Sequence, residues 1–69
     1  MPLTMLKAGE EKSVKKVGGR EETRQFLARL GFIPGSYITV VTKISGNVIV
    51  SIKESRIAVS REMAAKIMV

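Results

Sequence analysis

In this 69-residue chain, the candidates for catalysis are serine hydroxyls as nucleophiles and glutamate carboxylates as acids or bases. Histidine and cysteine are both absent, which removes the usual general base and the commonest zinc ligands. The serines therefore have no imidazole to activate them, and none stands in a nucleophile-elbow motif. The carboxylates are Glu10, Glu11, Glu21, Glu22, Glu54 and Glu62. We predict that the protein is not an enzyme and has no catalytic residue.

The two adjacent pairs of glutamates are explained better by solvation and helix stabilisation than by catalysis. Glu21 and Glu22 fall in the first turn of an expected helix, where negative charge interacts favourably with the helix dipole. Glu10 and Glu11, with nearby backbone carbonyls, offer at most a weak site for a hard cation, because the chain has no loop of alternating acidic ligands. We therefore expect no intrinsic metal site and no cofactor.

A glycine pair precedes the expected helix, in Gly18-Gly19-Arg20, and such a loop can bind phosphate at a helix N-terminus. The carboxylates of Glu21 and Glu22 follow at once and would repel a phosphate group. We interpret the pair as a hinge between a strand and the helix.

Positive charge is the strongest compositional feature, because 12 lysines and arginines give a net charge of +6. This charge would suit nucleic acid, an anionic membrane surface or an acidic protein partner. The basic residues are scattered, and Lys15-Lys16 is the only adjacent pair. An ordinary basic surface is therefore an equally good interpretation.

Nucleic-acid binding by a small β-barrel depends on exposed aromatic side chains on which bases can stack. Aromatic residues are 4% of this chain, namely Phe26, Phe32 and Tyr37. We assign both phenylalanines to the apolar face and the ending of the helix, which leaves Tyr37 and disfavours nucleic acid as a partner. Phosphate contacts stay open from Lys15, Lys16, Lys43, Lys53 and Arg56.

The elements that would position these side chains begin with a short amphipathic helix that ends near residue 30. Its apolar face is expected to hold Phe26, Leu27 and Leu30. Gly31 is placed to end the helix in a left-handed conformation, with Phe32 folded back onto the apolar face. Ile33-Pro34-Gly35-Ser36 then fits a type II turn.

Short strands and tight turns account for most of the remaining sequence. Alternation over residues 37–44 puts Ile38, Val40, Thr42 and Ile44 on one face and Tyr37, Thr39, Val41 and Lys43 on the other, outward face. Further strands are expected at residues 13–17, 48–52, 56–60 and 67–69, with helical turns at 3–6 and, capped by Ser60, at 61–66.

We predict a single domain over residues 1–69, of mainly β class. Its architecture would be a small SH3-like barrel of about five strands, with one short helix after the first strand and a helical turn before the last. An OB-fold is disfavoured, because its strands are usually longer and its helix comes later. No apolar run approaches the roughly 20 residues of a transmembrane helix or forms a signal peptide, so we expect a cytoplasmic location without membrane insertion.

The ordered series of motifs along the chain resembles FeoA, the small cytoplasmic protein of bacterial ferrous-iron uptake. The series comprises Leu3, Leu6 and Gly9, the stretch from Val14 to Gly19, the Leu-Gly-x-x-Pro-Gly corner from Leu30 to Gly35, Ile38 and Val40, the ending from Arg56 to Ala64, and Ile67 and Val69. The same pattern is found in the SH3-like C-terminal domain of iron-dependent repressors. Family members often carry a glycine where Glu54 stands here.

The resemblance implies a non-catalytic cytoplasmic module that binds and modulates the cytoplasmic part of a FeoB-type ferrous-iron permease. The candidate partner-binding residues are Arg24 and Arg29 on the helix, Tyr37 on the outward face of its strand and Lys43 beside the hairpin. Two alternatives stay open: a small basic barrel that binds nucleic acid, and a free-standing metal-responsive regulatory domain. Exposed sheet edges are compatible with a weak homo-oligomer.

Overall fold

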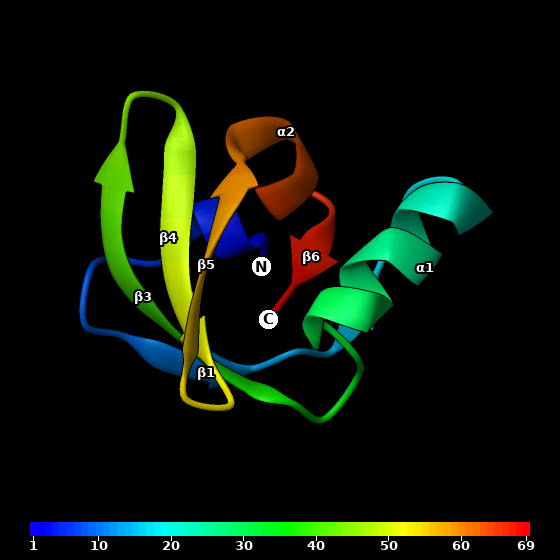
Figure 1. Ribbon diagram of the computed structural model, residues 1–69, viewed down its shortest axis with the longest axis horizontal. Helices are drawn as coiled ribbons and strands as arrows, with labels where there is room; N and C mark the ends of the chain where they lie inside the picture. The colour runs from blue at the N-terminus through cyan, green and yellow to red at the C-terminus, as the bar shows by residue number, and fades with distance from the viewer.

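Six strands, two α-helices and one 3₁₀ turn make up the computed structural model, which describes residues 1–69 (Figure 1). In chain order they are η1 (Leu3–Met5), β1 (Glu11–Ser13), β2 (Lys16–Val17), α1 (Glu21–Leu30), β3 (Tyr37–Ile44), β4 (Asn47–Ile52), β5 (Ser55–Ser60), α2 (Arg61–Ala64) and β6 (Ile67–Met68). An antiparallel four-stranded sheet has the order β1-β3-β4-β5, and β2 pairs with β6 in a second antiparallel sheet.

One apolar core joins the two sheets and the helix. Fourteen buried side chains form a single cluster, and no polar or charged residue is buried. The cluster combines Val50 of β4 with Ile67 of β6 and Leu27 of α1, so each element buries its apolar face against the others. The predicted mainly β class is confirmed.

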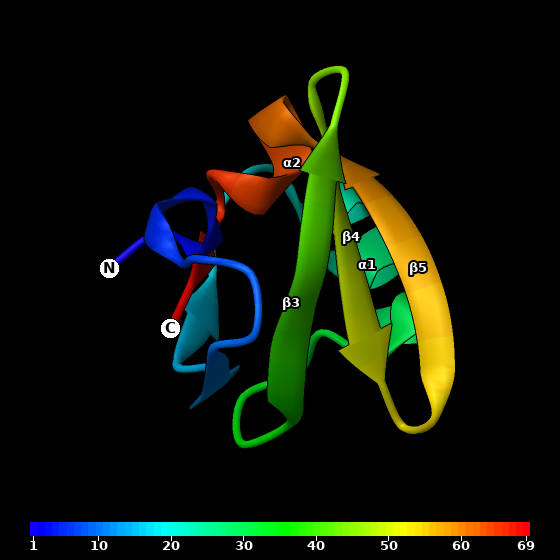
Figure 2. The same ribbon diagram turned by 90° about the vertical axis from the view of Figure 1, so that its left-hand side faces the viewer.

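The two chain ends lie together on one side of the molecule, opposite β5 (Figure 2). The Met1 ammonium donates to the carbonyl oxygen of Val69 at 3.0 Å, and Pro2 forms an isolated bridge with Met68. These contacts place η1 beside the end of the chain and bury Leu3 in the core.

The predicted strand at residues 13–17 is divided in the structure, because the chain passes there from one sheet to the other. Between β1 and β2, the N–H of Val14 donates to the carbonyl of Ser36 at 2.8 Å. The carbonyl of Val14 accepts the N–H of Gly35, also at 2.8 Å. The segment therefore pairs with the corner after α1, and the helix follows the second strand of six.

α1 ends as the sequence predicts. Gly31 has φ of 109°, its N–H donates to Ala28, and the N–H of Phe32 donates to the carbonyl of Leu27 at 2.9 Å. This is the Schellman pattern, and its two apolar partners, Leu27 and Phe32, are both buried. A Cβ at Gly31 would also lie 3.1 Å from Cδ1 of Ile52, so both backbone and packing require glycine.

Phe26 departs from the predicted helix face. Its side chain is 45% exposed, whereas Leu27 is buried and Leu30 is half-buried. Figure 1 shows the N-terminal part of α1 standing away from the strands, so the helix is anchored mainly at its C-terminal end. The assignment of Phe26 to the core face is therefore wrong, and both Phe26 and Tyr37 are exposed.

Two further local predictions are confirmed. In the type II turn after α1, the N–H of Ser36 donates to the carbonyl of Ile33 at 3.0 Å, and Gly35 has φ of 95°. At the start of α2, the Ser60 hydroxyl accepts the N–H of Met63 at 3.2 Å, as an N-cap does.

Candidate functional site

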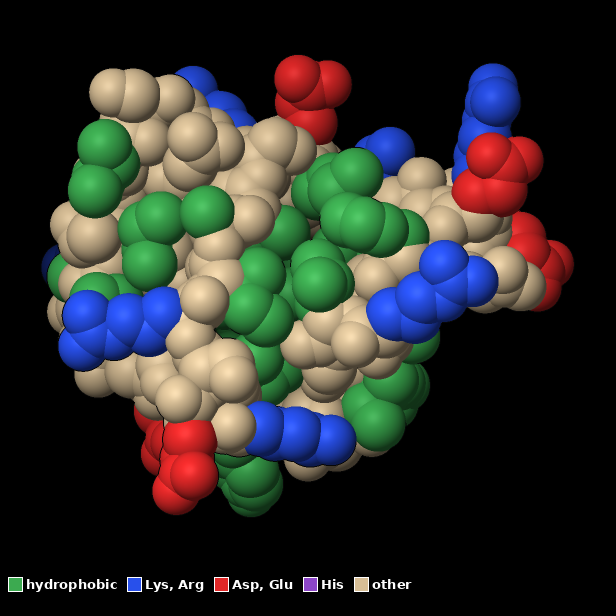
Figure 3. Space-filling view, viewed as in Figure 1, with side chains coloured by type: hydrophobic (Ala, Val, Ile, Leu, Met, Phe, Trp, Pro, Cys, Tyr) green, Lys and Arg blue, Asp and Glu red, His purple; other side chains and the backbone are tan.

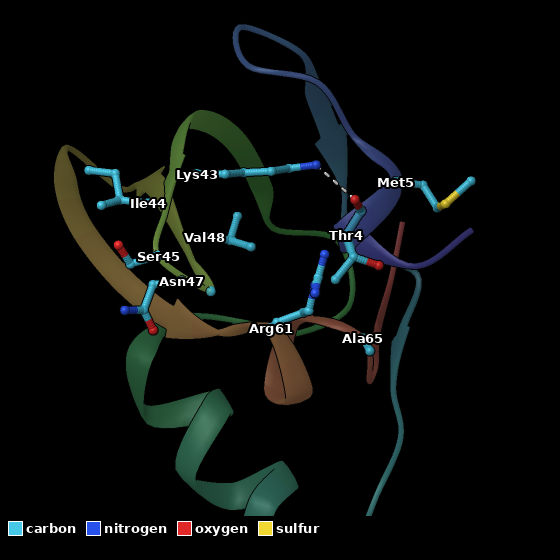
Figure 4. A pocket seen from close by; sticks show the side chains of 10 residues that line it. Thr4, Met5, Lys43, Ile44, Ser45, Asn47, Val48, Arg61 and Ala65 are labelled. Atoms are coloured by element: carbon cyan, nitrogen blue, oxygen red, sulfur yellow. Dashed lines mark hydrogen bonds between the residues drawn. The ribbon is translucent and has the colours of Figure 1, made fainter.

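A pocket of about 490 Å³ opens where η1, the β3–β4 hairpin and α2 meet (Figure 4). We call it the hairpin pocket, and it is lined by Thr4, Met5, Lys43, Ile44, Ser45, Gly46, Asn47, Val48, Arg61 and Ala65. The three contributing segments are far apart in sequence. The shape of the pocket therefore depends on tertiary contacts and not on one local motif.

The tight turn between β3 and β4 forms one wall. Ile44 pairs with Asn47, which leaves Ser45 and Gly46 as a two-residue loop. Their φ values are 44° and 80°, and positive φ at both central residues is what a type I′ turn requires. The carbonyl of Gly46 accepts the N–H of Arg61 at 2.9 Å, which ties the turn to the start of α2.

A β-bulge in β3 decides which side chains face the pocket. Val40 pairs with Val50, but the next pair along is Thr42 with Ile49, so Val41 is an extra residue in the strand. Because side chains alternate along a strand, one extra residue moves every later side chain to the opposite face.

The bulge reverses the faces predicted for the end of β3. Lys43 stands opposite Val48, which is 4% exposed and belongs to the core, so Lys43 projects from the inner face. Ile44 stands opposite Asn47 on the outer face and is 56% exposed. The strand faces predicted for Thr42, Lys43 and Ile44 are therefore wrong, and the bulge is the reason; Lys43 is nevertheless exposed, as predicted, because it lies at the open end of the sheet.

Lys43 connects the hairpin to η1. Its Nζ donates to the carbonyl oxygen of Thr4 at 2.8 Å, across 39 residues of sequence. Figure 4 shows this side chain extending from β3 toward Thr4, while the side chain of Arg61 reaches from α2 toward the same turn. An ammonium and a guanidinium carry more N–H donors than this one bond uses, so donors remain for a ligand.

α2 forms the third wall. The Ser60 cap fixes where the helical turn begins, and the buried Ala64 anchors it to the core. These two contacts hold Arg61 and Ala65 at the edge of the pocket.

The pocket carries uncompensated positive charge. Lys43 and Arg61 are its only ionisable lining residues, and Glu62, although next to Arg61 in sequence, does not line it. The one ion pair of the chain lies elsewhere, between Arg24 and Glu21 on α1 at 3.8 Å. Two cations without a carboxylate partner attract an anionic group.

Apolar side chains border these two cations. Met5 and Ile44 are both largely exposed, and Val48 closes the base of the pocket. An exposed apolar rim beside positive charge can bind a ligand that is part anionic and part apolar.

The structure does not bring the four predicted partner-binding residues together. Tyr37 and Lys43 lie at opposite ends of β3, roughly 20 Å apart at about 3.3 Å per residue. Arg24 is paired with Glu21, and Arg29 lies in the last turn of α1. Only Lys43 lines the pocket, and whether any of the four contacts a partner stays a prediction.

Arg61, the second cation of the pocket, is not among the binding residues that the sequence predicts. The available signal was the cap at Ser60, which places the next side chain in the first turn of a helix. That Arg61 and Lys43 line the same pocket could not be predicted from the sequence, because it depends on the bulge and on the hydrogen bond between the hairpin turn and α2.

Three further findings concern the rest of the molecule. No group of three or more histidine, cysteine, aspartate or glutamate side chains could hold a metal ion, and no helix is long and apolar enough to span a membrane. On the face shown in Figure 3, the cationic side chains stand apart, and apolar side chains gather near the centre. That face therefore has no continuous basic groove.

Comparisons with known proteins agree on one family. The model of the FeoA domain matches residues 1–69. A protein of Methanocaldococcus jannaschii described as "Putative Fe(2+) transport protein A" is 43% identical over 68 residues, which are 99% of this chain and 83% of that protein.

Solved structures support the same relationship. A crystal structure of an iron uptake regulatory protein, FeoA, has a TM-score of 0.91 at 28% identity, covering 99% of this chain and 92% of the other. FeoA of Stenotrophomonas maltophilia, solved with zinc and described as a prokaryotic SH3 domain protein, has a TM-score of 0.86 at 22% identity, with 99% and 87% covered. A manganese-dependent transcriptional repressor shares the fold at 17% identity and a TM-score of 0.88, over 97% of this chain and 39% of that one. The predicted SH3-like barrel is confirmed.

Proposed function

This chain belongs to the FeoA family, which has a role in ferrous-iron transport, and from that premise we propose that it binds the cytoplasmic part of a FeoB-type permease and modulates it. In this role the protein is a non-catalytic accessory module that works in the cytoplasm, where its partner domain lies. The observation that carries the proposal is the family match over residues 1–69, together with the 43% identical iron-transport relative.

The hairpin pocket supports binding in preference to catalysis. It presents two cations and an apolar rim, with no side chain placed as a nucleophile beside a base. Three elements of a small rigid barrel hold these groups in fixed positions. A preformed surface of this kind suits recognition of another protein.

The test uses the purified full chain and the purified cytoplasmic domain of the FeoB-type permease from the same genome. We expect a complex in isothermal titration calorimetry and a changed rate of GTP hydrolysis by the permease domain. Bovine serum albumin at the same concentration controls for non-specific contact. Absence of both binding and any change in hydrolysis would contradict the proposal.

The two alternatives predict different results from the same preparation. A metal-responsive regulatory domain should melt at a higher temperature with Fe(II) or Mn(II), because a ligand that binds only the folded state stabilises it. A nucleic-acid-binding barrel should bind mixed-sequence oligonucleotides with an affinity that falls steeply with salt. One observation favours nucleic-acid binding, namely that Phe26 is exposed as well as Tyr37, so two aromatic side chains are accessible.

A further inference from the structure

We propose that the hairpin pocket binds an acidic segment of a protein partner, with a carboxylate held between Lys43 and Arg61 and a neighbouring apolar side chain against Met5 and Ile44. This inference rests on the proposed function in taking the partner to be a protein. It adds the surface that makes the contact and the chemistry of the segment that fits it.

The charge of the pocket selects the carboxylate. Lys43 and Arg61 come from different elements, and neither forms an ion pair within the chain. The bond from Lys43 to Thr4 holds the ammonium in one position, so little side-chain freedom is lost when an anion binds. Hydrogen bonds between these cations and a carboxylate are stronger than neutral ones.

The apolar rim selects a peptide over a simple anion. The bulge in β3 turns Ile44 out of the core, and Met5 is exposed on the adjacent η1. A free phosphate or an acetate would satisfy the cations but leave both apolar side chains in water. A side chain such as leucine, next to an acidic residue, would cover them and gain free energy from the area removed from water.

Polar groups around the pocket can bind the backbone of the same segment. The side chains of Thr4, Ser45 and Asn47 line the pocket, and none makes a hydrogen bond within the chain. A peptide brings both N–H and carbonyl groups that can pair with these hydroxyls and this amide. The volume of about 490 Å³ accommodates a few residues.

Nucleic acid is the weaker match for this pocket. Single strands bind by stacking bases on aromatic side chains, but Phe26, Phe32 and Tyr37 all lie outside the lining. Two cations also neutralise few phosphates compared with an extended basic groove. We therefore assign the pocket to protein, and treat oligonucleotide binding as an outcome of the test.

The experiment records ¹H–¹⁵N spectra of the full chain during titration with three blocked hexapeptides. One alternates leucine and glutamate, the second has glutamine in place of glutamate, and the third has serine in place of leucine. We expect the first peptide to shift the amide signals of Ser45, Gly46, Asn47 and Arg61 and to bind at least about tenfold more tightly than the other two. Because this measurement uses the unaltered protein, it does not depend on any variant folding.

Matched charge variants then locate the contact. The double variant Lys43→Gln/Arg61→Gln should weaken binding of the first peptide about tenfold or more. The control is Lys12→Gln/Arg56→Gln, which removes the same charge from strand residues that lie outside the pocket lining, and it should change binding less than about twofold.

Each other outcome overturns the inference. Equal weakening of peptide binding by both double variants would mean that the peptide is attracted to the basic protein in general. Absence of peptide binding would mean that the pocket does not bind acidic, apolar peptides. Shifts of the same amides by a mixed-sequence oligonucleotide, without shifts by the acidic peptide, would assign the pocket to nucleic acid.

The permease domain separates this inference from the proposed function. If the unaltered chain binds that domain and Lys43→Gln/Arg61→Gln binds it equally well, the function stands and the pocket assignment is wrong. If the unaltered chain does not bind the domain but the acidic peptide still occupies the pocket, the pocket assignment stands and the partner is another protein.

Discussion

The two turns at the ends of β4 have the same backbone geometry but different surroundings. Ser45 and Gly46 precede the strand with φ values of 44° and 80°, and Lys53 and Glu54 follow it with φ values of 47° and 68°. The first turn is bonded to Arg61 and borders the hairpin pocket. The second closes the β4–β5 hairpin outside the pocket lining.

This difference separates two tasks within one small sheet. The Ser45-Gly46 turn borders the pocket that we propose binds a partner, whereas the Lys53-Glu54 turn reverses the chain above the buried Ile52 and lines no pocket. The first turn has glycine at its second position, but the second has two residues with side chains in the left-handed region, where they are strained. Substitutions at the two ends should therefore differ in size and in sign.

The largest effect on stability is expected from Ile52→Ala, in the strand end beside the Lys53-Glu54 turn. Ile52→Ala removes a side chain that is 2% exposed and lies beneath Gly31, so the free energy of unfolding should fall by about 2–5 kcal/mol. A core of this size rarely supplies more than roughly 3–5 kcal/mol, so the variant should be partly unfolded at 25 °C. Urea denaturation followed by circular dichroism measures the change.

Ile44→Ala is the matched control for this prediction. Its side chain lies on the exposed face after the bulge, so the stability should change by less than about 0.5 kcal/mol. Binding of the leucine–glutamate peptide should nevertheless weaken, because the apolar rim is lost. Equal destabilisation by the two variants would contradict the division between the ends.

A Cβ added at the pocket turn should give the next largest effect. Gly46→Ala meets no atom within 4 Å, so its cost comes from the φ of 80° alone, which lies beyond the roughly +50° to +70° that residues with a Cβ adopt. Alanine also restricts the unfolded chain, but at an incompatible φ the strain exceeds that gain, so the free energy of unfolding should fall by about 1–2 kcal/mol. Ser45→Ala is the control, because Ser45 already holds a Cβ at positive φ. If chemical denaturation shows both variants at the stability of the unaltered chain, the turn is not strained by a side chain at this position.

The turns and the helix ending could be predicted from the sequence, because short-range chemistry determines them. Gly31 and Phe32 close α1 through backbone bonds to residues within one helical turn, and Ser60 caps α2 through the residue three positions later. The β3–β4 hairpin is predicted in the right place, but its loop is one residue shorter than the expected strand bounds imply, because Asn47 pairs with Ile44 and leaves Ser45 and Gly46 as the loop. Each feature depends on a few neighbouring residues whose preferences agree.

The faces at the end of β3 and the pocket itself could not be predicted. Uniform alternation puts Lys43 on the outer face of β3, and nothing local to Val41 marks it as an extra residue in the strand. Phe26 was misplaced because helical spacing shows which residues share a face but not how far along the helix that face stays covered. Both errors concern tertiary packing, which also brings the Lys43 ammonium to the Thr4 carbonyl of η1.

The two serines at the ends of β5 should also differ in their effects, because Ser60 caps α2 and Ser55 does not. Ser60→Ala removes the acceptor for the N–H of Met63 and should lower the unfolding free energy by about 1 kcal/mol. Because the cap positions Arg61, peptide binding should weaken as well. Ser55→Ala, at the opposite end of β5, should leave both quantities unchanged, and Ser60→Thr should restore them. Thermal melting measures the stability and peptide titration measures the binding. Loss of stability in Ser55→Ala but not in Ser60→Ala would contradict the role of Ser60 as the cap of α2.

The smallest expected effect has the opposite sign and lies at the other turn. Glu54 has φ of 68°, and a left-handed conformation costs a residue with a Cβ about 1–2 kcal/mol. Glu54→Gly removes that cost but gives the unfolded chain more freedom, worth about 0.4–1 kcal/mol against folding. The net gain in unfolding free energy should be roughly 0.5–1 kcal/mol, which raises the melting temperature of a domain this size by a few degrees, about 4–8 °C per kcal/mol.

Charge must be separated from backbone strain in this last comparison. Glu54→Gln removes the carboxylate but keeps the Cβ at positive φ, so it should give no gain, and in a chain of net charge +6 the loss of an anion does not favour folding. Differential scanning calorimetry of the two variants distinguishes the causes. If Glu54→Gln stabilised the chain as much as Glu54→Gly, strain would not explain the difference between the two turns. If only the glycine variant gains stability and peptide binding stays unchanged, the Lys53-Glu54 turn affects the stability of the protein but not binding at the hairpin pocket. The two ends of β4 would then contribute to different properties.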